Sequence, residues 1–173
     1  MTYDYHWGHS DPVAGPNTPL TGNNGSSINT TLSFALAHAM PAASLLLGIA
    51  WYGREYPTVG PYYQAATNVS TTVPGQTAHA YSLPMMWERA RTLGQEGEMW
   101  DASTQTPWYR YRDAVWWEGY GDNPRSLKLK YELVKTQALK GILVWMLNSC
   151  TQTQAPELWR GLDEAFGPRG AVK

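Results

Sequence analysis

The chain has 173 residues, with 13 Lys and Arg against 14 Asp and Glu, which gives a formal net charge of −1. This length suits one domain with a sizeable core, and the near-neutral charge, without a basic stripe, excludes a surface built to neutralise a phosphate backbone. We therefore expect a single domain over residues 1–173 and no nucleic-acid partner.

The aromatic residues are unusually polar, with nine Trp and eleven Tyr against two Phe. Trp and Tyr rings combine an apolar face with a hydrogen-bonding edge, which suits the apolar C–H face and hydroxylated rim of a sugar. An aromatic-rich core would explain the same composition. The composition therefore favours a sugar ligand without requiring one.

The chain begins with Met1–Tyr5, whose alternation of β-forming residues predicts a strand starting at the first residue. A loop rich in Gly, Pro and Asn follows, as far as Gly25. His6 and His9 could suggest a metal, but no second pair of ligands at a matching spacing accompanies them. We expect no metal and no cofactor.

A helix and a buried strand come next. Ser26 or Ser27 caps the helix, whose apolar residues share one face as far as Pro41. The apolar run from residue 45 predicts a strand buried on both faces, as in parallel sheets, and it ends in Trp51, Tyr52, Gly53 and Arg54. Sites on parallel sheets gather at the carboxyl ends of strands. The last aromatic residues therefore belong either to a site or to the core.

Residues 55–76 are rich in Pro, Gly, Thr and Ser and predict a long loop or an irregular excursion from the sheet. Ser82 caps a predicted helix that continues through Leu93. Three short aromatic segments predict small antiparallel strands: 98–101, 108–112 and 115–118. Together these elements predict a small α+β insertion over about residues 55–122.

The last third of the chain alternates helix and strand. Ser126 caps a predicted helix that ends at Lys140 and Gly141. Residues 142–147 form a second continuous apolar strand, and residues 156–166 form a last helix. The whole order predicts an α/β fold.

Compartment and membrane association depend on weaker signals. The single cysteine, Cys150, excludes an intrachain disulfide and a multi-cysteine metal site. Residues 35–52 are largely apolar, but polar residues and a proline interrupt them, so we expect no membrane span. No signal peptide is visible, and the sequons at Asn24, Asn29 and Asn68 would matter only in a secretory pathway. The sequence leaves the localisation open.

Four blocks of sequence resemble the chitinase-like glycoside hydrolases of family 18 in order and spacing. They are Met-Thr-Tyr-Asp at 1–4, Leu-Gly-Ile-Ala-Trp-Tyr-Gly-Arg at 47–54, Ser-Leu-Lys-Leu-Lys at 126–130 and Leu-Lys-Gly-Ile-Leu-Val-Trp at 139–145. The similarity covers nearly the whole chain. The segment between Trp100 and Asn123 resembles the di-N-acetylchitobiase-like branch.

The resemblance implies a partial (β/α)₈ TIM barrel. Residues 1–5, 45–52 and 142–147 would be its sixth, seventh and eighth strands, with the α+β insertion after the seventh. Because complete barrels need about 250 residues, the chain resembles the C-terminal part of one. Expected partners are then an N-acetylglucosamine oligosaccharide and either the missing N-terminal half of the barrel or a second copy of the chain.

The resemblance also implies a reaction. The family cleaves β-1,4-linked N-acetylglucosamine oligosaccharides of chitin with retention, and the sugar's own 2-acetamido oxygen is the nucleophile. The residues that the resemblance assigns to the site are Tyr3 and Asp4, which would orient the acetamide, Trp145, which would form the floor beneath the sugar ring, and Met1, Tyr52 and Arg54, which would contact the sugar.

The chain departs from the family at two places. The Asp-x-x-Asp-x-Asp-x-Glu motif that supplies the general acid is absent, since no Glu has an Asp two residues before it. Asn148, Ser149 and Cys150 also stand where many members have Gly and Asp. The isolated chain is therefore expected to be inactive, and the alternatives are a non-catalytic sugar-binding remnant or a degenerate scaffold.

Overall fold

The computed structural model describes residues 1–7, 13–60 and 70–167 of the chain. His9 and Asn68, which the sequence singled out, lie outside these residues. Over these ranges, no helix has both the length and the apolar character needed to cross a membrane. No group of three or more His, Cys, Asp or Glu side chains in the described ranges could hold a metal ion.

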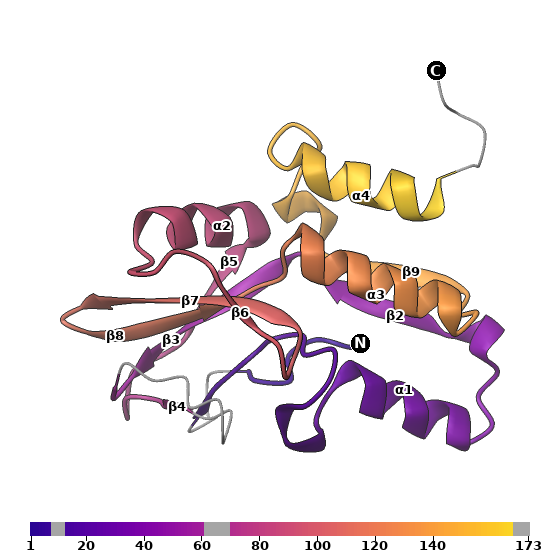
Figure 1. Cartoon of the computed structure of the whole chain (residues 1–173), viewed down its shortest axis with the longest axis horizontal. Coiled ribbons are helices and arrows are strands. Elements are labelled where there is room, and N and C mark those ends of the chain that lie inside the picture. The colour runs from indigo at the N-terminus through magenta and orange to yellow at the C-terminus, as the bar shows by residue number, and fades with distance from the viewer. Residues whose placement is uncertain (8–12, 61–69, 168–173) are drawn as a thin grey trace.

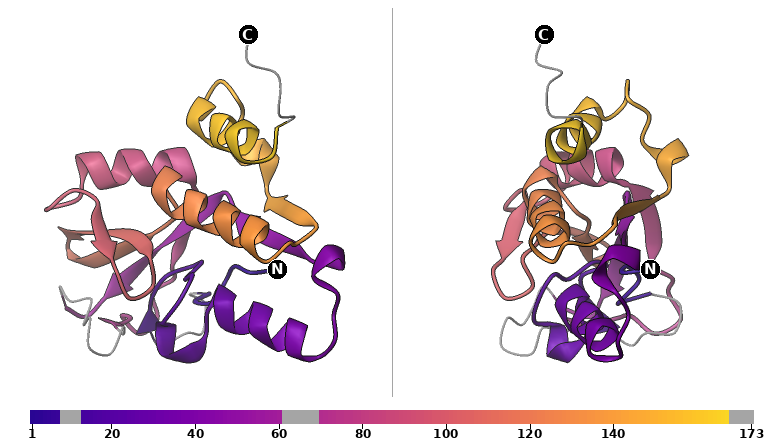
Figure 2. Two further views of the ribbon diagram at one scale, coloured as in Figure 1. Left: turned by 45° about the vertical axis from the view of Figure 1, so that its right-hand side comes forward. Right: turned by 90° about the vertical axis from the view of Figure 1, so that its right-hand side faces the viewer.

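A pair of parallel strands lies at the centre of the fold (Figure 1). Strand β2 (Leu46–Ala50) pairs with β9 (Gly141–Trp145), in a register that joins Ala50 to Trp145 at the carboxyl end. Figure 2 shows α3 (Pro124–Thr136) beside this pair and α4 (Pro156–Phe166) above it. The two apolar runs in the sequence therefore meet in one sheet.

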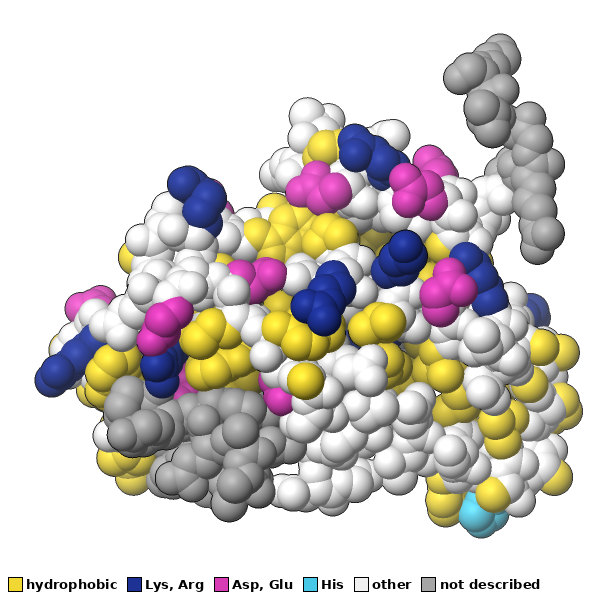
Figure 3. All heavy atoms as spheres, in the orientation of Figure 1, with side chains coloured by type: hydrophobic (Ala, Val, Ile, Leu, Met, Phe, Trp, Pro, Cys, Tyr) yellow, Lys and Arg dark blue, Asp and Glu magenta, His cyan; other side chains and the backbone are white. Residues whose placement is uncertain are grey.

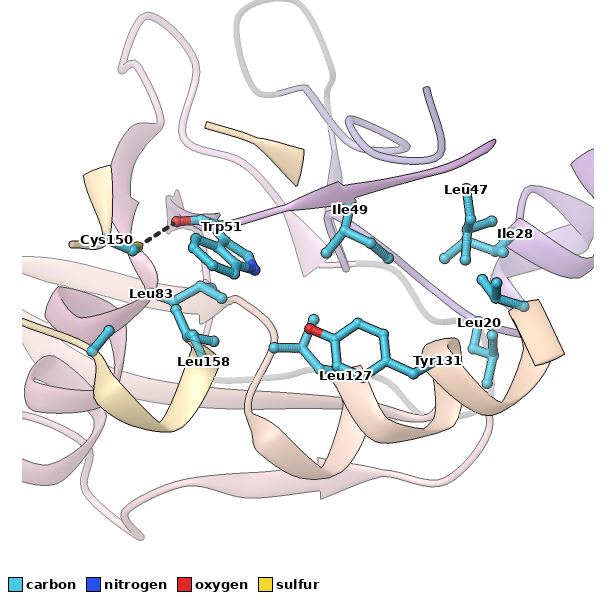
Figure 4. Close-up of a cluster of buried hydrophobic side chains, with 12 residues drawn as sticks. Leu20, Ile28, Leu47, Ile49, Trp51, Leu83, Leu127, Tyr131, Cys150 and Leu158 are labelled. Atoms are coloured by element: carbon cyan, nitrogen blue, oxygen red, sulfur yellow. Dashed lines mark hydrogen bonds between the residues drawn. The ribbon is translucent and has the colours of Figure 1, made fainter. Parts of the chain in front are cut away.

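The main core lies on one face of this pair. Leu47, Ile49 and Trp51 alternate along the chain and point toward Leu127 of α3 and Leu158 of α4 (Figure 4). Helix α1 (Ile28–Ala37) contributes Ile28 to the same cluster. Alternate side chains of a strand point to the same face, so these three lie together on the core. Trp51 is thus a core residue, fully buried, with Trp159 edge-on at 5.3 Å.

The opposite face of the pair is exposed only in part. Leu46, Leu143 and Trp145 have exposed fractions of 47%, 46% and 52%, but Gly48 and Ala50 of β2 are buried. The prediction of a strand buried on both faces is therefore confirmed for β2 from Leu47 to Ala50. It does not extend to Leu143 and Trp145 of β9, because within the described residues β9 pairs only with β2.

The first five residues form no strand, contrary to the prediction. They run beside β2, where Thr2 Oγ1 donates a hydrogen bond of 2.6 Å to the carbonyl of Gly48. A Cβ on Gly48 would lie 3.0 Å from the Met1 Cα, so glycine permits this close approach. Asp4 has a φ of 61°, which breaks the extended conformation that a strand needs.

A second, antiparallel sheet follows directly from β2. Its five strands lie in the order β5-β3-β8-β7-β6, and α2 (Leu83–Thr92) packs on one face, where Met86 and Ala90 meet Tyr109 and Tyr111. The strands are β3 (Tyr52–Thr58), β5 (His79–Ser82), β6 (Met99–Asp101), β7 (Thr106–Asp113) and β8 (Val115–Tyr120). Short strands β1 (Val13–Ala14) and β4 (Ser70–Thr71) pair separately.

The antiparallel sheet corrects two sequence expectations. The three predicted aromatic strands correspond to β6, β7 and β8, with β6 starting one residue later than predicted. However, β3 occupies the start of the segment predicted as a loop, and β5 was not predicted. Pro57 and the charged pair Arg54 and Glu55 hid the strand pattern of β3, although Glu55 is fully buried there and paired with Arg89.

The helix starts agree with the sequence except at α3. The Ser27 side chain accepts from the Thr30 amide, as expected of an N-cap. In α3 the cap is Asn123, and Ser126 completes a capping box by accepting from the Asn123 amide. Pro124 therefore occupies the first turn, and the helix starts before the predicted Ser126.

A buried ion pair joins the antiparallel sheet to α3. Lys130 of α3 donates to both carboxylate oxygens of Asp122, and both side chains are 1% exposed. Thr18 Oγ1 donates to Asp122 at 2.8 Å and accepts from Lys130 at 2.8 Å, while Ser126 donates to Asp122 at 2.6 Å. Burial lowers the pKa of Lys130, although Asp122 opposes this effect.

Candidate functional site

A cavity of about 310 Å³ lies at the carboxyl end of the parallel pair, where β2 continues into β3. The N-terminal segment, β3, β5 and the end of β9 each contribute to it. The lining residues are Asp4, Tyr52, Arg54, Ala80, Tyr81, Ser82, Trp145 and Met146. Strand ends in parallel sheets are the usual place for such sites.

Asp4 is the centre of the polar wall of this cavity. Its Oδ1 accepts from the Tyr52 hydroxyl at 2.7 Å and from Arg54 Nε and Nη2 at 3.1 and 2.8 Å. None of the described residues donates to the other oxygen, Oδ2. The Asp4 carboxylate is thus held in one orientation while keeping an oxygen for a ligand.

The electrostatics keep the two donors of this wall, Tyr52 and Arg54, protonated. Burial, together with the bond to Asp4, raises the pKa of Tyr52, so its hydroxyl remains a donor at neutral pH. Burial works against the charge of Arg54, but the hydrogen bond and the charge attraction to Asp4, together with smaller contributions from Tyr56 and Tyr52, outweigh it and raise the pKa of Arg54. The wall therefore presents a carboxylate that is neutralised by a guanidinium, which suits an uncharged polar ligand.

Trp145 forms the apolar side of the cavity. It is the last residue of β9, and its carbonyl accepts from the Trp51 amide at 2.8 Å. The backbone is thus fixed to the core strand while 52% of the side chain surface stays exposed. A fixed, open indole beside polar groups is the combination that binds the apolar face of a sugar.

The structure brings four of the six predicted site residues to this cavity: Asp4, Tyr52, Arg54 and Trp145. Tyr3 does not line the cavity, and its ring packs edge-on against Tyr52 with ring centroids 6.1 Å apart. Met1 is 91% exposed and lies against Gly48 instead. Four predicted residues therefore converge on the cavity, whereas Tyr3 and Met1 do not line it.

The sequence missed the third wall, made by Ala80, Tyr81 and Ser82 of β5. Arg89 lies over the Tyr81 ring at 4.5 Å, and the Tyr81 hydroxyl bonds to His79. Ser82 was noticed only as a helix cap. The signal that could have found this wall is the pairing of Ser82 with Tyr52, which no local pattern reveals.

A larger cavity, about 480 Å³, lies between α3 and α4. In Figure 3, hydrophobic side chains between the two helices are flanked by charged ones. Its lining comes from Leu127, Tyr131 and Leu158 with Lys, Arg and Glu residues at the rim. Because these residues lie on helix surfaces away from the strand ends, the smaller cavity is the better candidate.

Comparison with known proteins gives a consistent result. The family model "Glycosyl hydrolases family 18" matches residues 1–149. Among curated relatives, a di-N-acetylchitobiase of Mus musculus is 26% identical over 186 residues, covering 94% of the chain and 47% of the relative. A cortical fragment-lytic enzyme of Bacillus subtilis is 28% identical over 172 residues, covering 96% of the chain and 33% of the relative.

Solved structures share the fold. A family 18 chitinase of Cycas revoluta in complex with (GlcNAc)4 is 25% identical, with a TM-score of 0.76, and the match covers 96% of the chain and 46% of the chitinase. A human pseudo-chitinase with retained chitooligosaccharide binding is 16% identical, with a TM-score of 0.77 over 97% of the chain and 50% of that protein. The chain thus spans half or less of these proteins.

Proposed function

The chain belongs to glycosyl hydrolases family 18, and on that premise we propose that it forms the acetamide-orienting part of a site for β-1,4-linked N-acetylglucosamine oligosaccharides. The observation that carries the proposal is the convergence of Asp4, Tyr52, Arg54 and Trp145 on one cavity from three separate segments. The chitinase that binds (GlcNAc)4 supports the ligand class.

In this proposal the 2-acetamido oxygen of the sugar attacks the anomeric carbon, so the protein supplies orientation and not a nucleophile. Asp4 would use its available Oδ2 to hold the acetamide N–H. Tyr52 and Arg54 would keep that carboxylate in a fixed orientation. Trp145 would support the sugar ring. Tyr3, which packs edge-on against Tyr52, is the residue that the family resemblance assigns to the acetamide carbonyl.

We further propose that the fold is the C-terminal part of a (β/α)₈ barrel. The segment 1–5, β2 and β9 would be its sixth to eighth strands, and the antiparallel sheet would be an insertion over about residues 55–122 in a single domain. The exposed face with Leu143 and Trp145 supports this proposal, because such a face would line the interior of a complete barrel.

The missing general acid favours a second candidate, a chain that binds oligosaccharides without cleaving them. The sequence lacks the family's acidic motif, and the human pseudo-chitinase of the same fold keeps chitooligosaccharide binding. Partners would then be the oligosaccharide and whatever polypeptide completes the barrel. Hydrolysis by the chain together with such a polypeptide would decide between the two candidates.

The first test concerns Trp145. Trp145→Ala should weaken the binding of N-acetylchitobiose roughly two- to tenfold, because an aromatic contact contributes about 0.5–1.5 kcal/mol beyond its buried area. Binding by the wild-type chain should itself be weak, on the order of millimolar, since only part of the site is present. NMR titration gives the affinities, and circular dichroism monitors the folding of each variant.

Trp116→Ala is the matched control for this test. Trp116 is another partly exposed indole, but it lies on β8 opposite Thr58 and does not line the cavity. Its loss should leave the affinity unchanged. Equal affinities of folded wild type and Trp145→Ala would contradict the proposed role of the indole.

A second prediction concerns assembly through the free edge of β9. We expect the isolated chain to associate at micromolar concentration, since β9 pairs only with β2 among the described strands and its free edge can template further pairing. Leu143→Lys should shift sedimentation toward the monomer. Leu93→Lys changes a residue of similar exposure, 42%, at the end of α2 and should not. A compact wild-type monomer would refute this expectation.

A further inference from the structure

Asn17 is a buried residue in the loop before α1, and it contacts two residues of the cavity without lining it. Only 1% of its surface is exposed. Its Oδ1 accepts from the Asp4 amide at 3.0 Å, and its Nδ2 donates to the Tyr52 carbonyl at 3.2 Å. The Asn17 carbonyl also accepts from the Tyr5 amide at 3.2 Å. One side chain therefore ties the backbones of Asp4 and Tyr52 together.

The backbone of Asp4 needs such support. Its φ of 61° lies in the left-handed region, which non-glycine residues adopt rarely and keep only where the surroundings hold them. A change in this φ would redirect the Asp4 side chain, whose carboxylate now accepts from Tyr52 and Arg54. The hydrogen bonds from the Asp4 and Tyr5 amides to Asn17 support the left-handed conformation.

Asn17 is itself anchored from the opposite side. The next residue, Thr18, is 3% exposed and bonds to both members of the buried pair Asp122 and Lys130. A buried ion pair is often no more stabilising than apolar residues in its place, so what it can contribute is a defined geometry. Here it fixes the position of the segment that carries Asn17.

We propose that Asn17 is a positioning residue, which places Asp4 and Tyr52 for the ligand and is held in place through Thr18 by the Asp122–Lys130 pair. The consequence for sugar binding rests on the proposed function. The effect on the geometry of Asp4 and Arg54 does not, because it concerns the chain without ligand.

The test without ligand follows the side-chain Nε–H group of Arg54 by ¹⁵N NMR in the full chain, with the signal assigned by Arg54→Lys. In the wild type this group donates to Asp4 and should be protected from solvent exchange. Asn17→Ala should abolish that protection, and Asp4→Ala should do the same. Ser27→Ala removes the cap of α1 in the same loop, a loss of comparable type, and should leave the Arg54 signal unchanged.

Thr18→Val keeps the Asn17 side chain and removes the hydroxyl that bonds to Asp122 and Lys130. This variant replaces Asn17→Ala in the test if Asn17→Ala does not fold. It should reduce the protection of Arg54 Nε–H. An unchanged Arg54 signal in folded Asn17→Ala, or in Thr18→Val when the first variant is unfolded, would overturn the proposal.

The test with ligand separates positioning from general stability. If Asn17 acts through Asp4, Asn17→Ala should weaken N-acetylchitobiose binding, yet cause no further loss in an Asp4→Ala background. Independent, additive losses would overturn the proposed route through Asp4. A wild-type chain that binds no oligosaccharide while Asn17→Ala still releases Arg54 would refute the proposed function and support the positioning role.

Discussion

Asp122→Ala should lower the free energy of unfolding by about 3–5 kcal/mol, the range typical for breaking a buried ion pair from one side. The substitution leaves the ammonium group of Lys130 buried, with Thr18 as its remaining hydrogen-bond partner in the described structure. For a domain whose total stability is on the order of 5–15 kcal/mol, this is a large share. Urea denaturation followed by circular dichroism measures the loss.

Two comparisons identify the cause. Glu88→Ala removes the partner of Arg91 in an exposed pair and should cost far less, because solvent screens that pair. Asp122→Leu combined with Lys130→Met removes both charges and should be clearly less destabilising than Asp122→Ala alone. A loss for Asp122→Ala as small as that for Glu88→Ala would mean that Lys130 finds water or another partner.

The isolated chain should not release a chromophore from an N-acetylglucosamine glycoside. Proton donation to the leaving oxygen contributes about 10²–10⁴ in rate, and the sequence lacks the motif that supplies the donor. Asp4 is the one carboxylate that lines the cavity among the described residues, and it is paired with Arg54. Glu55, the residue after Arg54 on β3, is fully buried and bonded to Arg89.

A complete family 18 chitinase, assayed in parallel, shows that the substrate and conditions permit turnover. Asp4→Ala is the informative variant of this chain. Turnover by the wild type that Asp4→Ala abolishes would mean that a carboxylate of this chain serves as the acid. Turnover that survives Asp4→Ala would point to a contaminating hydrolase.

The sequence predicted the elements that local patterns define. The apolar runs in β2 and β9 and the helical spacing in α3 and α4 were sufficient, because burial against one core sets both patterns. β3 was missed because its polar residues face a partner helix and not water, as the pair Glu55 and Arg89 shows. The exposure of Leu143 likewise could not be predicted from the local sequence. It depends on whether another strand pairs with the free edge of β9, which the apolar run does not reveal.

Only part of the candidate site could be predicted from the sequence. Asp4, Arg54 and Trp145 were found by family resemblance, and their convergence did not follow from spacing. Asn17 was not predicted, because its role depends on backbone groups 13 and 35 residues away in sequence. Contacts of this kind leave no periodic signal in the chain.

The single residue between β2 and β3 has a consequence for protein engineering. Trp51 links the parallel pair to the antiparallel sheet, in which Tyr52 and Arg54 lie at the start of β3 while Ala80 and Ser82 belong to β5. A chimaera joined after Arg54 and before Gly121 would keep the Asp4 and Trp145 walls and replace the β5 wall as a cassette. Ligand preference in such chimaeras could then be varied on one side of the cavity without redesigning the other.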